Sequence, residues 1–134
     1  MKQSLGIVIC ALFGANAIGR HHHHRPHSGA DLIQIRTNAN ADLLAEVNSK
    51  IDDVATLLEK KKEPACDEAC KKGCDEVADN MIRELHNPLH DITWNCKNNY
   101  DTYTTDYDPE HNHFDRISMD VMATQRTLNR IQQL

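Results

Sequence analysis

The sequence has few aromatic residues, few glycines and prolines, and no long apolar run beyond its N-terminal stretch. Aromatic residues make up only 4% of the chain, which excludes an aromatic-rich β-sandwich core and a base-stacking nucleic-acid platform. The formal net charge of −5 argues against nucleic acid as a partner, because such proteins need a basic surface. With 134 residues, the chain has room for one small domain at most.

The first 17 residues have the pattern of a secretory signal peptide. Lys2 supplies the positive start, residues 5–15 are apolar, and Ala15-Asn16-Ala17 provides a small-x-small cleavage site. The apolar stretch is too short to span a bilayer, which takes about 20 residues, and no later stretch is a candidate transmembrane segment. The sequence therefore predicts cleavage after Ala17 and a secreted, extracellular product beginning near Ile18.

Residues 18–30 are rich in histidine and contain Pro26 and Gly29, so we expect them to be disordered. Their imidazoles could bind Zn²⁺, Cu²⁺ or Ni²⁺ weakly, and the alternative is a solubilising, pH-sensitive linker. The candidate ligands are His21, His22, His23, His24 and His27.

Residues 31–62 have helical periodicity. Apolar residues recur at the spacing of a heptad seam, and earlier positions of the same phase are mostly polar. The seam consists of Leu44, Val47, Ile51, Val54 and Leu58, preceded by Ile33, Thr37 and Asn40. Asp31 suits a helix cap and Pro64 ends the run. The segment is therefore either a short coiled coil or an amphipathic helix that packs within its own domain.

Residues 63–134 form the cysteine-containing part of the chain, and we expect two more main helices there. The first runs from residue 64 or 65 to residue 86, with a kinked extension over 89–94, and residues 95–109 form a polar loop. The last helix runs from Pro109 to the end, and its apolar face comprises Phe114, Ile117, Val121, Leu128 and Ile131, with Thr124 at the missing step. No segment alternates with the period of a strand. The predicted fold is all-α, a small helical bundle or short coiled coil of three main helices, stapled by disulfides.

Four cysteines follow the leader: Cys66, Cys70, Cys74 and Cys96. An even number in an oxidising compartment favours disulfides. On an intact helix the first three would share a face with their Cβ atoms about 5–6 Å apart, too far for a bond between neighbours. The cysteines then form either two intrachain disulfides with a distorted helix start or bridges to a second copy of the chain.

Other polar clusters suggest weaker metal sites. His86 and His90 are four residues apart, as a metal-binding pair on a helix requires, although Pro88 lies between them. Acidic residues between positions 106 and 115 suggest Ca²⁺, but their spacing is not that of an EF-hand. The possible ions are therefore Zn, Cu or Ca.

The stretch His90-Asp91-x-x-Trp94 resembles the His-Asp-x-x-aromatic core of secreted phospholipase A2 enzymes. The resemblance implies that His90 activates water, that Asp91 helps bind Ca²⁺, and that Asp120 supplies the later acidic residue. It covers about five residues, and the chain lacks both the cysteine shortly before this pair and the glycine-rich Ca²⁺ loop of that family.

The sequence favours a secreted helical interaction or structural protein over an enzyme. Its partner would be a second copy of the chain or another extracellular protein. An alternative is the precursor of a toxin or peptide hormone, because the basic run Lys60-Lys61-Lys62 precedes the cysteine-containing part and suits proteolytic cleavage after Lys62.

Overall fold

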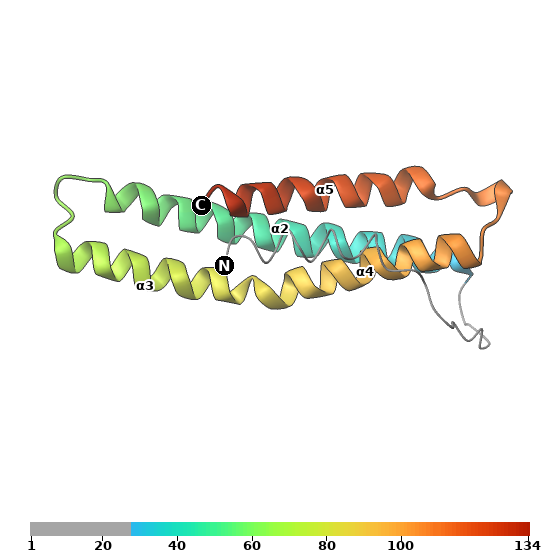
Figure 1. Ribbon diagram of the computed structural model, residues 1–134, viewed down its shortest axis with the longest axis horizontal. Coiled ribbons are helices and arrows are strands. Elements are labelled where there is room, and N and C mark those ends of the chain that lie inside the picture. Colours follow the sequence, from blue (N-terminus) through green and yellow to red (C-terminus); the bar gives the residue numbers. More distant parts are fainter. Residues whose placement is uncertain (1–27) are drawn as a thin grey trace.

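The computed structural model describes residues 28–134, which form four α-helices and one short 3-10 helix. In chain order they are α2 (Gly29–Lys61), α3 (Glu68–Glu84), α4 (His86–Thr105), η1 (Pro109–His111) and α5 (Phe114–Gln132). Because α3 and α4 follow one another almost end to end, the helices form three long rods side by side (Figure 1). The all-α prediction of three main helices is confirmed.

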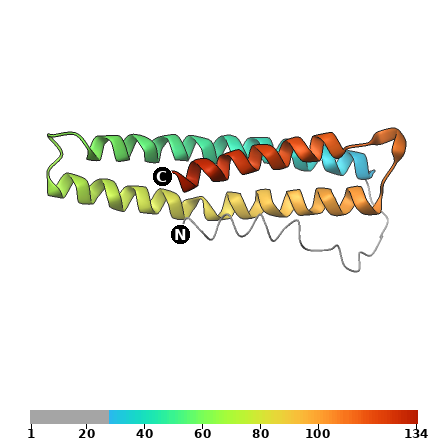
Figure 2. The ribbon, with the colours of Figure 1, turned by 45° about the horizontal axis from the view of Figure 1, so that its top comes forward.

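The long helix α2 is central to the packing, since α3, α4 and α5 all pack against it. The rod formed by α3 and α4 runs back along α2, and α5 returns beside α2 (Figure 2). The heptad-spaced residues of α2 face the inside: Leu44, Val47, Ile51 and Val54 are each 7% exposed or less. The seam thus packs within the chain's own bundle.

All three rods contribute to one apolar core. Its buried residues are Leu44, Val47, Ile51, Leu85, Leu89, Ile92, Cys96, Leu128 and Ile131. The segments 31–62 and 63–134 therefore share one core. Among the described residues, no helix is both long and apolar enough to cross a membrane.

The expected helix starts need correction. Ser28, rather than Asp31, caps α2, and its hydroxyl accepts a hydrogen bond from the backbone N–H of Asp31. The second main helix begins at Glu68 and not at residue 64 or 65, because Asp67 is its N-cap. The last main helix begins at Phe114 and not at Pro109, which instead opens η1. Phe114, the first residue of α5, is 53% exposed and does not belong to the core.

The expectation of a loop over residues 95–109 is also wrong for most of its length, because α4 continues to Thr105. Its buried face is polar there, with Asn99 0% and Thr102 1% exposed. The polar half of α2 supplies the partners: Arg36 donates to the carbonyl oxygen of Asn98 and to the hydroxyl of Thr102. A polar stripe that packs against another polar stripe has no hydrophobic period, so the sequence pattern does not indicate a helix here.

Candidate functional sites

The cysteines lie at two separate places. Cys66 and Cys70 form a disulfide with a Cα–Cα distance of 5.2 Å. Cys66 lies in the turn before α3, so the spacing that keeps apart two residues on one helix does not apply to this pair. The condition of an intact helix through all three cysteines is not met, and of the two expected intrachain disulfides with a distorted helix start the structure contains one, Cys66–Cys70.

Cys74 is a free, buried thiol next to this disulfide. It lies one turn after Cys70 on α3, and the Sγ atoms of Cys66, Cys70 and Cys74 are all within 4.8 Å of one another. We call these three residues the cysteine trio. Within the trio only Cys74 has a thiol left for a bridge to a second copy of the chain, and the structure of a single chain does not test that alternative.

Cys96 is far from the trio in sequence and belongs to a buried polar layer in the bundle. Each rod contributes to this layer. Asn40 of α2 donates to the Asp120 carboxylate of α5 at 2.7 Å, and the Cys96 thiol of α4 donates to the same carboxylate at 3.6 Å. Burial, together with the nearby Asp120 charge, raises the pKa of the Cys96 thiol to about 12. At neutral pH the thiol is therefore protonated and a poor nucleophile.

The Asp120 carboxyl is also perturbed. Burial raises its pKa above the ordinary value, and the hydrogen bonds from Asn40 and Cys96 oppose the shift. The phospholipase-like residues are not gathered into one site: Asp120 is 7% exposed in the core, whereas the side chains of His90 and Asp91 are 70% and 66% exposed on α4.

Of the histidines predicted from the sequence as metal ligands, only His86 and His90 lie in the part of the chain that the structure describes. His86 and His90 both lie on α4 with exposed side chains, and Pro88 fits into its first turn. Among the described residues, no third histidine, cysteine or carboxylate gathers with them into a metal-binding group. Ala17 and the histidines His21, His22, His23, His24 and His27 lie outside the described residues.

The basic run that could be a processing site forms the C-terminal end of α2. Lys60 and Lys61 lie in the last turn and Lys62 is the C-cap. Lys61 forms an ion pair with Asp75 of α3 at 2.9 Å, and Lys62 pairs with Glu59 at 3.1 Å. Lys62 is exposed, so a protease could reach the peptide bond after it. Helices α2 and α3, which precede and follow this bond, pack against each other.

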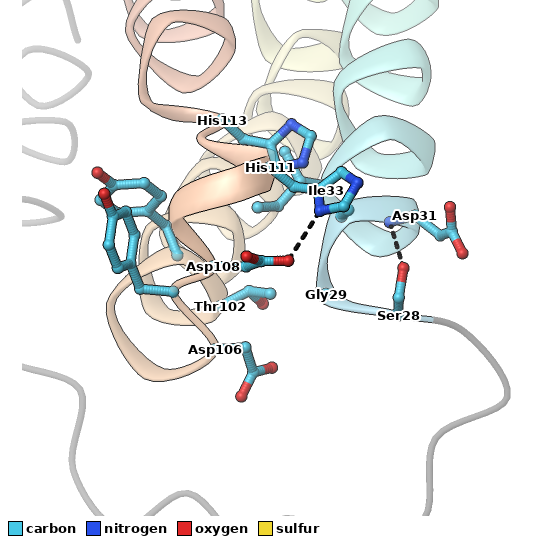
Figure 3. Close-up of a pocket in the computed structure, with 12 residues that line it drawn as sticks. Ser28, Gly29, Asp31, Ile33, Thr102, Asp106, Asp108, His111 and His113 are labelled. Atoms are coloured by element: carbon cyan, nitrogen blue, oxygen red, sulfur yellow. Dashed lines mark hydrogen bonds and ion pairs between the residues drawn. The ribbon is translucent and has the colours of Figure 1, made fainter.

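A pocket of about 320 Å³ lies at the opposite end of the bundle, where α2 begins and α4 ends (Figure 3). Gly29 allows the two helices to approach closely here, because a Cβ atom at this position would be only 3.2 Å from the side chains of Thr102 and Asp106. Acidic, aromatic and histidine side chains line the pocket, among them Asp31, Asp106, Tyr103, Tyr107 and His113.

The electrostatics of this pocket are dominated by carboxylates. Asp108 and His111 are paired at 2.8 Å, and this hydrogen bond lowers the pKa of the Asp108 carboxyl (Figure 3). Burial, with the nearby positive charge of Arg116, lowers the pKa of His113. At neutral pH the pocket therefore carries net negative charge. Asp108, Glu110 and His111 place one ligand atom each within 4.8 Å of the others, but all three are exposed.

Aromatic side chains gather beside this pocket. The ring of Tyr103 lies 5.3 Å from that of Tyr107 and 5.9 Å from that of Phe114, between ring centroids. Tyr100 lies one turn earlier on α4. We call Tyr100, Tyr103, Tyr107 and Phe114 the aromatic end. Three of the four are more than one-third exposed: Tyr100 by 37%, Tyr107 by 51% and Phe114 by 53%. Sequence reasoning missed this patch, because it assigned the tyrosines to a loop and Phe114 to the core.

No protein family, curated protein or solved structure matches this chain. The assignment of a function therefore rests on its own side chains.

Proposed function

We propose that the protein is a small secreted interaction protein that binds an extracellular protein partner through its aromatic end. The observation that carries this proposal is the concentration of exposed aromatic side chains at one end of a chain in which aromatic residues are rare. Exposed tyrosine and phenylalanine are enriched at the centres of protein interfaces, because they bury a large area at a small entropic cost.

The charges around the aromatic end favour a basic partner. Asp31, Asp106 and Asp108 line the neighbouring pocket. Glu110 lies in η1 and Asp115 lies in the first turn of α5. Two copies of the chain that met at this end would bring like charges together, whereas Lys or Arg on a different protein would be attracted. The proposed ligand is therefore a segment with an apolar anchor flanked by basic residues.

A selection of displayed peptides tests this proposal. The mature protein is used as bait against a random peptide library, and the selected peptides are then measured against three variants. We expect enrichment of Lys and Arg around an apolar residue. Tyr107→Ser and Phe114→Ser should each weaken binding, and raising the salt concentration should weaken it further.

Trp94→Ser provides the matched control. Trp94 is 56% exposed, but it lies nine residues before Tyr103, on the opposite face of α4. Its loss should therefore leave binding unchanged. Peptides with no basic bias, or binding that survives both aromatic substitutions, would contradict the proposal.

The alternative function is a precursor that is cleaved after Lys62. The exposed position of Lys62 at the end of α2 supports access for a protease. Because α2 shares the core with α3, α4 and α5, we expect cleavage to leave a two-chain bundle instead of releasing residues 63–134. The N-terminal residues of the secreted protein decide between the alternatives: a second N-terminus at Glu63 supports the precursor.

A further inference from the structure

The cysteine trio combines a closed disulfide with a third sulfur at ligand distance. The three Sγ atoms lie within 4.8 Å of one another, and Cys74 remains a thiol. A metal–sulfur bond of about 2.3 Å places the sulfurs of a three-coordinate site about 4 Å apart. Once the disulfide is opened, small side-chain movements bring all three sulfurs to this separation.

Positive charge lies near the trio on α3 and on α2. Cys66 and Cys70 flank the N-cap of α3, a 17-residue helix whose positive end stabilises nearby thiolates. Lys61 of α2 pairs with Asp75, the residue that follows Cys74. Its pKa is raised mainly by Asp75, and the charges of Cys74 and Glu68 add smaller effects, so the Lys61 ammonium is within electrostatic range of Cys74.

We propose that the reduced cysteine trio is a binding site for one soft, monovalent d¹⁰ cation, Cu(I). A thiol reductant transfers two electrons and two protons to the Cys66–Cys70 disulfide and is itself oxidised to a disulfide. The three thiols of Cys66, Cys70 and Cys74 then release their protons to solvent as their sulfurs bind the ion. Thiolates select soft ions, and three ligands suffice for Cu(I).

The disulfide makes this site sensitive to redox conditions. In the oxidised chain two of the three sulfurs are bonded to each other, which leaves Cys74 as the one thiol of the trio. The oxidised chain should therefore bind Cu(I) much more weakly than the reduced chain. This proposal does not rest on the proposed extracellular function.

A competition titration tests the site. The mature protein is reduced, freed of reductant under anaerobic conditions, and titrated with Cu(I) buffered by the chromophoric chelator bathocuproine disulfonate. We expect one tightly bound ion per chain and a thiolate-to-copper charge-transfer absorption. Cys74→Ser should lower the affinity by at least about tenfold, because only two sulfurs remain. Cys66→Ser is a second variant with the same expected loss.

Cys96→Ser is the matched control, because Cys96 is buried in the polar layer and does not belong to the trio. It should bind Cu(I) as the wild type does. Every variant keeps the His-rich segment, so any copper held there cancels in the comparison. Equal affinity of Cys74→Ser and the wild type, or an equal loss in Cys96→Ser, would overturn the proposal, provided that circular dichroism shows all variants folded.

Discussion

At the scale of single residues, the buried polar layer is the least expected feature of the bundle. Asn40 is 0% exposed and sits where the heptad pattern of α2 would ordinarily place an apolar residue. Its amide donates to Asp120, and its carbonyl oxygen accepts from Asn95 at 2.8 Å. A buried polar group at such a position can fix the register of packed helices at some cost in stability.

The buried charge of Asp120 leads to a prediction about pH. Because burial raises the pKa of Asp120 above its ordinary value of 3.8, folding favours the protonated acid. The stability from this group is therefore fully present below pH 3.8 and is lost as pH rises through the folded-state pKa. Asp120→Asn, which can still accept from Asn40, should have a higher Tm than the wild type at pH 7.

Thermal melts between pH 3 and 7 check this prediction. The gain in Tm should shrink as the pH falls, and Asp115→Asn, at an exposed position of the same helix, should show no such trend. A gain in Tm that does not depend on pH would mean that the charge of Asp120 does not destabilise the folded protein.

At the scale of elements, the apolar periodicity of the sequence predicts the buried faces of the helices, whereas polar segments give no such signal. Four residues of the α2 seam and four positions of α5 are buried as the sequence predicts: Leu44, Val47, Ile51 and Val54 of α2, and Ile117, Thr124, Leu128 and Ile131 of α5. The second half of α4 was missed because its inner face is amides, hydroxyls and a carboxylate. The start of α3 does not follow from the sequence pattern, because the cap Asp67 lies among other charged residues.

The cap of α3 gives a prediction at this scale. The Asp67 carboxylate accepts a hydrogen bond from the backbone N–H of Cys70 at 2.8 Å. Asp67→Ala should lower the free energy of unfolding by about 1 kcal/mol, whereas Asp67→Asn, which caps equally well, should change it little. Urea denaturation of the oxidised protein measures both. Equal losses in the two variants would show that the cap does not stabilise α3.

At the scale of the whole molecule, one core joins all three rods. Ile92 of α4 is 0% exposed and packs with core residues of the other rods. Ile92→Ala should cost about 2–5 kcal/mol of unfolding free energy, and should do so in one cooperative transition. Val77→Ala, at a 43% exposed position of α3, should stay within about 0.5 kcal/mol of the wild type. Two separate transitions in chemical denaturation would argue against a shared core.

The sequence predicted the helical class and most of the apolar core, but not the sites. Neither the pairing of Cys66 with Cys70 nor the aromatic end follows from spacing alone. The first depends on where α3 begins, and the second depends on α4 continuing to Thr105 and being joined to α5 through η1. Both depend on backbone geometry that polar sequence patterns do not specify.

We propose that the secreted protein is one three-helix bundle that keeps Lys62 and Glu63 joined and contains the Cys66–Cys70 disulfide. The most direct test is the intact mass of the protein recovered from culture medium, measured with and without reduction and after alkylation of the unfolded chain. The predicted result is a single chain that begins near Ile18, contains one disulfide and has two alkylated thiols, Cys74 and Cys96. A chain that retains Met1, a fragment that begins at Glu63, or a mass showing two disulfides would contradict it.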